Sequence, residues 1–215
     1  LGIIIGVCAV IVLVSVVQGS TNNITESVES LGANSITVTL TGRNSTKTLE
    51  MDEMEEFQQE NEDLIQYVVP TMSANGTLKY SNSNMTTSVT GSTPDYLTVK
   101  NREIAQGRFL NGLDVSGRRR NVVIGSYNAK ELFGFESPID KQIKINGQIY
   151  TVIGVLEEVS DSERSSEDDV AIISYTAGRT LFKTSRIRSY TVWAASTEVV
   201  DAATTVLKSF LCEKL

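Results

Sequence analysis

The chain opens with an uncharged apolar run and continues as a polar sequence, and this junction is its most informative pattern. The run Leu1–Val17 (LGIIIGVCAVIVLVSVV) contains no charged residue. A helix over it covers about 25 Å at ~1.5 Å per residue, near the short end of what spans a bilayer. Ile24, Val28 and Leu31 then recur at helical spacing before a glycine. We therefore expect one transmembrane and stalk helix over residues 1–31.

A cleaved signal peptide is the alternative interpretation of the apolar run. Such a peptide needs a basic segment before its apolar core and small residues at the cleavage site. The basic segment is absent, and Val16–Ser20 (VVQGS) is a poor cleavage site. The sequence also starts inside the apolar run and without Met, so we interpret it as a fragment whose beginning was cut away. A retained membrane helix is the favoured interpretation.

Alternating and helical patterns predict a strand, a helix and a second strand after the stalk. Ser35–Leu40 alternates and is rich in β-branched residues, which is typical of a strand. Leu49–Asp63 has helical spacing, with two methionines and Phe57 on its apolar side. Leu64–Met72 predicts the second strand, and Pro70 is expected near its end or at a sheet edge.

Polar turn-forming residues dominate the next segment, Ser73–Thr93. Its Ser, Thr, Asn and Gly content predicts solvent-facing strands around a turn at Asn75-Gly76. A second polar segment is the charged run Ser160–Asp169 (SDSERSSEDD). Both are poor in core residues, so ordering them needs a partner to offset the lost entropy. We expect these two segments to be the mobile surfaces through which the domain contacts partners.

The remaining chain predicts short strands and helices at close spacing. In order they are a helix at Pro94–Lys100, a strand at Asn121–Gly125, a helix at Ser126–Phe133 ended by Gly134, a hairpin over Gln142–Val155 turning at Asn146-Gly147, a strand at Val170–Ser174, a helix at Tyr175–Lys183, a strand at Ile187–Ala195 and a helix at Glu198–Lys214. The last two elements can complete the sheet begun at Ser35. We therefore predict an α+β fold, with one lobe over residues 32–93 and 187–215 and an inserted β-rich lobe over residues 94–186.

Composition narrows the range of functions. The chain has 19 basic and 26 acidic residues, a net charge of -7, which disfavours nucleic acid or anionic lipid as the main partner. It contains no histidine, the usual base of a catalytic triad and the commonest metal ligand. Cys8 and Cys212 lie in the apolar run and near the end of the chain, so no disulfide framework is expected.

Four candidates for chemistry each have a simpler structural explanation. Ser126 follows a strand as in a nucleophile elbow, but Asn128 replaces the required glycine, so we interpret the serine as a helix N-cap. The carboxylates of Ser160–Asp169 lack the register of a calcium loop and fit a solvated, mobile loop. The basic triplet Arg118–Arg120 fits a solvated turn, and Trp193 fits a core position on an alternating strand.

No Walker A or other glycine-rich phosphate loop is present, so any ATP chemistry belongs to another chain or domain. We predict no catalytic, cofactor-binding or metal-binding residue, no cofactor and no enzymatic activity within this chain.

Several short motifs, weak individually, occur together in an informative order. They are Leu31–Val38 (LGANSITV), Gly107–Leu110 (GRFL) with Asp114, Val122–Gly125 (VVIG), Glu131–Gly134 (ELFG), Ile143–Gly147 (IKING), Tyr150–Val155 (YTVIGV) and Ile172–Tyr175 (IISY). With the opening apolar run they cover nearly the whole chain. On these residues the chain resembles the first membrane helix and the extracytoplasmic (periplasmic core) domain of MacB-like, or FtsX-like, ABC transporter permeases.

The resemblance implies a fold, partners and a function. The fold is a split β-α-β-β-α-β porter lobe that carries an inserted β-rich lobe. The partners are an ABC ATPase subunit or domain, a second permease copy, a membrane-fusion or adaptor protein and the lipid bilayer. The implied function is that of an exporter permease in a bacterial cell membrane, whose extracytoplasmic domain couples cytoplasmic ATP hydrolysis to extrusion of a drug, peptide or lipoprotein.

Two alternatives stay open on the sequence. One is a single-span membrane-anchored sensor or surface interaction protein, which also has an apolar helix leading into a β-rich head. A pilin-like protein would carry an acidic residue near the start of its apolar helix, and Leu1–Val17 has none. The other alternative lies within the family, as an FtsX-like regulator of a cell-wall hydrolase.

Overall fold

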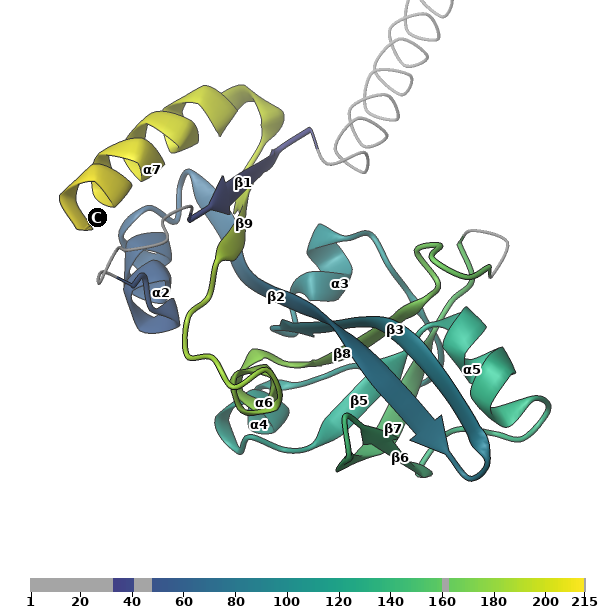
Figure 1. Cartoon of the computed structure of the whole chain (residues 1–215). Helices are drawn as coiled ribbons and strands as arrows, with labels where there is room; N and C mark the ends of the chain where they lie inside the picture. Colours follow the sequence, from purple (N-terminus) through teal and green to yellow (C-terminus); the bar gives the residue numbers. More distant parts are fainter. Residues whose placement is uncertain (1–32, 41–47, 160–162, 215) are drawn as a thin grey trace, which may run out of the picture.

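The computed structural model describes residues 33–40, 48–159 and 163–214 (Figure 1). The predicted transmembrane and stalk helix at residues 1–31 lies outside these ranges. Among the residues that the structure describes, no helix has the length and hydropathy needed to span a membrane. The described part is a mixed α+β fold.

Most elements lie where they were predicted, but β4 and α4 were not predicted and β2 is longer than expected. The strands are β1 (Ser35–Thr39), β2 (Ile65–Tyr80), β3 (Ser83–Ser92), β4 (Ile104–Gly107), β5 (Asn121–Ile124), β6 (Gln142–Ile145), β7 (Gln148–Leu156), β8 (Val170–Ser174) and β9 (Ser189–Ala194). The helices are α2 (Met51–Glu60), α3 (Tyr96–Val99), α4 (Gly112–Ser116), α5 (Ser126–Phe133), α6 (Tyr175–Leu181), the 3-10 turn η1 (Thr197–Val199) and α7 (Val200–Lys214).

Strand β2 is shared by two packed units. Its first half pairs antiparallel with β9, from Ile65 to Thr71, and its second half pairs antiparallel with β3, from Met72 to Tyr80. β9 also pairs with β1, which confirms that the closing strand completes the sheet begun at Ser35. In Figure 1, β2 runs from the sheet beside α2 and α7 into the strands of the second unit.

The first unit, called the helix layer here, consists of β1, β9, the first half of β2, α2 and α7. The apolar side predicted for α2 is confirmed, because Met51, Met54 and Phe57 are all buried. The Phe57 ring stacks on Phe210 of α7, with ring centroids 4.4 Å apart. Ala203 and Leu207 of α7 are buried in the same cluster. The two helices therefore share one core against the sheet.

The second unit, called the barrel, is a closed ring of strands. Its pairing runs β2–β3–β8–β5–β7–β6 and returns to β2, while β4 extends the sheet beyond β7. The interior side chains come from every strand of the ring: Leu78, Val89, Val122, Ile124, Ile143, Ile145, Tyr150, Val152, Ala171 and Ile173. Closure pairs strand edges that would otherwise be open.

The division of the chain into lobes at the predicted residues stays a prediction. The packing itself changes along β2: Met72 belongs to the core of the helix layer, and Leu78 to the core of the barrel. Trp193, predicted as a core residue, is buried with Val69 and Val99 where α3 meets β2 and β9. The helix layer and the barrel thus have separate cores, and β2 runs continuously from one into the other.

The turn predicted at Asn75-Gly76 is wrong. Both residues lie within β2, opposite Ser88 and Thr87, and the chain turns instead after Tyr80, where Ser81 has a positive φ of 50°. A Cβ at Gly76 would lie 2.6 Å from Val89 Cγ2. The glycine therefore serves a close approach inside the barrel, and Ser73–Ser92 is a paired hairpin of the ring rather than a solvated loop.

Pro70 does not lie near the end of its strand, since β2 continues to Tyr80 and Pro70 lies opposite Tyr190. Its side toward β3 is an open edge, as the alternative placement expected. The Pro70 carbonyl accepts a hydrogen bond from Ser92 Oγ (2.9 Å). The C=O and the ring nitrogen of Pro70 therefore both point toward β3 and away from β9. β3 ends at Ser92. No residue of β3 lies opposite Pro70, so a backbone N–H at this position would have no strand partner. A proline is therefore tolerated here.

The glycine of the VVIG motif, Gly125, lies directly after β5 and close to the backbone that precedes β8. A Cβ built on Gly125 would lie 2.0 Å from the backbone oxygen of Asp168, which cannot rotate away. Gly112 in α4, by contrast, has open space around its Cβ position. The two positions give a matched pair of substitutions.

We predict that Gly125→Ala lowers the free energy of unfolding by about 2–3 kcal/mol, because the backbone has to move to accept the methyl group. Gly112→Ala should change it by less than about 1 kcal/mol and in the stabilising direction. Urea unfolding of both variants measures the difference. Equal stabilities for the two variants would contradict the close approach at Gly125.

Candidate functional site: the groove between the helix layer and the barrel

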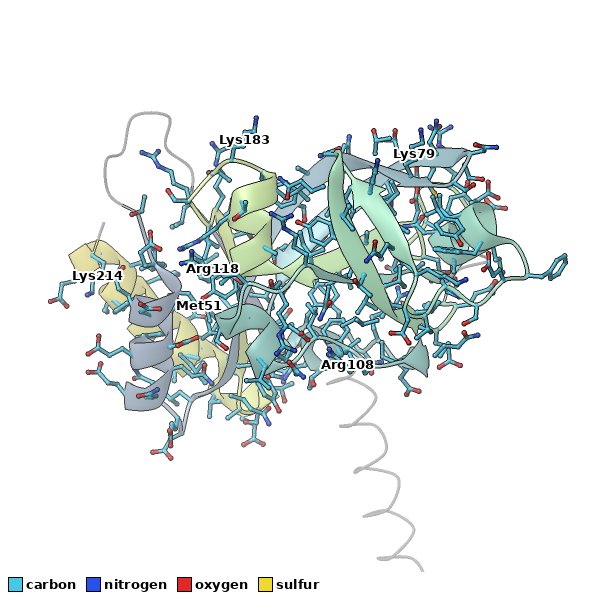
Figure 2. All side chains as sticks on the ribbon, turned by 90° about the horizontal axis from the view of Figure 1, so that it is seen from below. Met51, Lys79, Arg108, Arg118, Lys183 and Lys214 are labelled. Carbon is cyan, nitrogen blue, oxygen red and sulfur yellow. The ribbon has the colours of Figure 1, made fainter. Side chains whose placement is uncertain are left out.

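A groove of about 480 Å³ separates the helix layer from the barrel. One wall comes from α2, with Met51, Glu55 and Gln58, and from Val68 of β2. The opposite wall comes from α4, α6 and the turn that carries Arg118. Figure 2 labels one residue of each wall, Met51 and Arg118.

The two walls differ in charge. The α2 wall carries Glu55, and burial, together with the charges of Asp52 and Asp95, raises the pKa of that carboxyl. The other wall carries Arg118, which has a positive φ of 49°. Sequence reasoning assigned Arg118–Arg120 to a solvated turn. All three are exposed, and the structure adds that Arg118 faces the groove.

An ion pair bridges the groove at one end and is called the clasp here. Arg179 of α6 donates to Glu50, the residue that caps α2. The guanidinium also lies 5.6 Å from the centroid of the Tyr175 ring. Both partners of the ion pair are part-exposed, at 30% for Arg179 and 42% for Glu50. Pairs this exposed contribute about 0–1 kcal/mol, so the clasp orients the two units without locking them.

The α4 wall is fixed by a buried carboxylate. Asp114 is fully buried and accepts hydrogen bonds from Arg108 Nη1 (2.7 Å), Asn121 Nδ2 (2.7 Å) and the Asn111 N–H (3.0 Å). Burial on its own raises the pKa of this carboxyl, but these three donors outweigh it and hold the pKa below its ordinary value. Thr176 Oγ1 of α6 donates to the Val115 carbonyl (2.7 Å), which ties α4 to α6.

The acidic run predicted to be a solvated loop is anchored at its end by two buried carboxylates. Asp168 is fully buried and pairs with Arg102 Nη2 at 2.9 Å, while Asp169 accepts from the Ser165 N–H (2.9 Å). Asp168 and Asp169 are thus held by these contacts, and the solvated-loop interpretation is wrong for these two residues. Within the described residues, no group of three or more His, Cys, Asp or Glu side chains is arranged to hold a metal ion.

Ser126, which the sequence suggested as a helix N-cap, lies at the start of α5. Ser126 is the first residue of α5, and the N-cap is Gly125, so the predicted cap is displaced by one residue. Gly134 ends that helix with a positive φ of 59°, as predicted. Asn128 is buried and donates to Thr87 Oγ1 and to the Val170 carbonyl, which makes it a structural link between α5 and the barrel.

The comparison with family models decides the identity. The model of the MacB-like periplasmic core domain matches residues 1–210. The chain belongs to this family. The resemblance drawn from the short motifs is confirmed.

Relatives and solved structures agree with this assignment. The chain is 27% identical over 210 residues to the macrolide export ATP-binding/permease protein MacB of Marinobacter nauticus, covering 94% of this chain and 32% of the relative. It is 32% identical over 181 residues to the MacB of a Shewanella species, covering 82% and 28%. The chain thus spans about a third of the length of these curated relatives.

Among solved structures, the periplasmic region of MacB from Actinobacillus actinomycetemcomitans matches with a TM-score of 0.70 at 25% identity, covering 89% of this chain and 91% of that one. The extracellular domain of the noncanonic ABC-type transporter YknZ from Gram-positive bacteria shares the fold, with a TM-score of 0.66 at 20% identity over 79% and 88% of the two chains.

The motifs that carried the resemblance are structural in this periplasmic core domain. In the GRFL segment, Arg108 pairs with Asp114, and Gly107 lies at a positive φ of 79° against the Ile153 carbonyl. In YTVIGV, a Cβ at Gly154 would lie 2.3 Å from the Arg108 carbonyl. The family signature therefore encodes the packing of the barrel and of the α4 wall rather than a reactive centre.

We predict that Asp114→Asn lowers the free energy of unfolding at neutral pH by about 2–3 kcal/mol, because the buried carboxylate loses its charge-assisted hydrogen bond with Arg108. The folded-state pKa of Asp114 is lowered, so its contribution is fully present above the unfolded pKa of about 4 and is lost as pH falls through the folded value. The difference in the free energy of unfolding between wild type and variant should therefore disappear at acid pH. Denaturant titrations at several pH values measure it.

The matched control is Asp63→Asn, which changes an exposed carboxylate. Its stability should follow the wild type at every pH. If Asp114→Asn is less stable than the wild type by the same amount from neutral pH to well below about 4, the ionised carboxylate does not have the proposed role.

Proposed function

We propose that this chain is the extracytoplasmic domain of an ABC exporter permease and that it couples ATP hydrolysis in the cytoplasm to extrusion of a substrate. The observation that carries this proposal is the pair of separate cores joined by β2 and by the return segment between α6 and β9. Packed units of this kind move as rigid bodies between discrete arrangements. The groove between them changes width when they move.

The distribution of polar interactions supports such a movement. The buried Asp114 cluster fixes α4 to the barrel, whereas the contact across the groove includes the exposed clasp of Glu50 and Arg179. Breaking an exposed ion pair costs little, while breaking a buried one costs several kcal/mol. Movement therefore separates the units at the clasp and leaves each core intact.

The proposal also covers the membrane helix, the lobe organisation and the partner proteins. Residues 1–31 form the first membrane helix, and β1, α2, β9 and α7 belong to a split porter-like lobe into which the barrel is inserted. An ABC ATPase subunit or domain supplies the energy, and a second permease copy and a membrane-fusion or adaptor protein complete the assembly in a bacterial cell membrane. The curated relatives are named for macrolide export, which favours a drug-like substrate over a peptide or a lipoprotein.

We predict that Arg179→Glu in the intact transporter reduces macrolide efflux several-fold, because the new carboxylate repels Glu50 and the groove no longer closes. Arg179→Lys keeps the charge and should retain most of the efflux. Drug accumulation in cells, measured at matched expression, gives the result. Retained ATP hydrolysis alongside lost efflux separates broken transmission from a damaged assembly.

The control for the clasp is Lys130→Glu, which breaks another exposed ion pair, with Glu158, on the barrel alone. Efflux in this variant should equal that of the wild type. Normal efflux in Arg179→Glu, at normal expression, would remove the clasp from the mechanism of transmission.

The gene context gives a further, independent check of this function. We expect the complete gene to encode additional membrane helices after residue 215 and an ATPase domain, or a neighbouring gene to encode the ATPase. Sequencing of the locus decides this. A gene with neither feature would favour the single-span sensor or surface protein instead.

A further inference from the structure

One side of β2 is unpaired over a short stretch between two partner strands. On this side, β9 pairs with β2 as far as Thr71, and β6 pairs from Leu78 onward. The Asn146 side chain and backbone extend the β6 contact to Thr77, with hydrogen bonds of 2.9 and 3.0 Å. Within the described residues, no strand pairs with Ser73–Gly76 on this side.

The backbone groups of Ser73 and Asn75 point into this gap. The N–H and C=O of Thr77 both bond to Asn146, so they face away from β3. Along a strand, the backbone N–H and C=O groups of successive residues point to alternate sides. Those of Ser73 and Asn75 therefore point to the same side as those of Thr77. The close contact of Ser73 Oγ with Thr90 Oγ1 (3.1 Å) fits a pair that does not exchange backbone hydrogen bonds. The gap therefore offers donors and acceptors in strand spacing.

The gap opens into a groove of about 240 Å³. Its floor includes Met72 and Phe182, and its outer wall includes Thr184, Arg186 and Arg188 from the segment between α6 and β9. This segment separates from β2 beyond the Thr71–Ser189 pair, which leaves the space alongside Ser73 and Ala74. An extended chain can therefore lie beside β2 at this point.

The surface around the gap is basic, although the chain as a whole is acidic with a net charge of -7. Five exposed cations belong to the three segments that border it: Lys79, Lys144, Lys183, Arg186 and Arg188. Those segments, residues 71–79, 142–146 and 183–189, contain no Asp or Glu. In the described part of the chain none of the five makes a salt bridge. Figure 2 shows Lys79 and Lys183 on one side of the molecule and Arg108 on the opposite side.

We propose that this edge of β2 binds an extended acidic segment of a protein partner by strand addition. The open N–H and C=O groups recognise the partner's backbone, and the cations around them select carboxylate side chains. A lipid headgroup or a nucleic acid would use the charge but not the alternating donors and acceptors of the strand, so the open edge favours a peptide. The inference concerns binding alone and does not depend on transport.

The test uses an acetylated, fluorescein-labelled octapeptide that alternates Glu with Val and Thr. Its binding to the full chain in a non-ionic detergent is followed by fluorescence polarisation. We expect binding that weakens about tenfold or more when both arginines are reversed in Arg186→Glu/Arg188→Glu. N-methylation of alternate peptide nitrogens should weaken it similarly, because it removes the donors of the ladder while leaving the charge unchanged.

Two protein variants separate the edge from general charge and from misfolding. Arg119→Glu/Arg120→Glu reverses two exposed arginines outside the patch and should leave the affinity unchanged. Asn75→Pro removes one N–H of the open edge without removing a bond to β3, and should weaken binding while the melting temperature stays close to that of the wild type. If Asn75→Pro does not fold, the N-methylated peptide still tests the ladder.

Three outcomes would overturn the proposal. The first is no binding of the acidic peptide to the wild type. The second is equal binding of the N-methylated peptide, which would show a site that responds to charge alone. The third is binding to phosphatidylglycerol vesicles, lost in Arg186→Glu/Arg188→Glu, without binding to the peptide, which would assign the patch to a membrane surface.

Discussion

The fold depends on a single strand that serves two cores. β2 is 16 residues long and exchanges one antiparallel partner for another near its middle. A strand in one sheet needs only one alternation of buried and exposed residues. β2 has to bury Val68 in the helix layer and Leu78 in the barrel, and its backbone has to accommodate Pro70 between them. The proline lies where its missing N–H has no ladder partner, so the change of partner costs no hydrogen bond.

Polar interactions divide into those that hold each core together and those that lie between the cores. Asp114 and Asp168 are fully buried carboxylates, each with an arginine partner and backbone N–H donors. Removing one partner of such a cluster leaves a buried charge uncompensated, which makes these residues intolerant of change. The pair of Glu50 and Arg179 is half-exposed, and water can replace either partner at little cost. In the proposed mechanism, this contrast leaves each core intact while the contact between them opens.

Charge on the surface follows the same architecture. The α2 wall of the groove is acidic, with Glu55 among several carboxylates, whereas five exposed cations belong to the segments around the open edge of β2. A net charge of -7 would predict repulsion of acidic partners over the whole surface. The fold instead places five exposed cations around a stretch of β2 where backbone groups have no strand partner on one side. Partner recognition is therefore a property of a local surface and cannot be judged from the net charge.

Local signals in the sequence predicted the structure correctly where residues close together in the chain determine the conformation. The helix at Ser126–Phe133 with its terminating Gly134, the turn at Asn146-Gly147 and the apolar side of α2 followed from spacing, capping and turn chemistry, and the motifs identified the family. Asn75-Gly76 shows the limit of this approach, since the same dipeptide that turns at residue 146 lies in mid-strand when Val89 and Ile145 pack against the glycine. Closure of the barrel, the buried roles of Asp114 and Asp168, the clasp and the open edge all depend on residues far apart in the chain. The sequence by itself determined the elements and their order, and only the tertiary structure decided which polar residues are buried, because burial depends on contacts that local spacing does not encode.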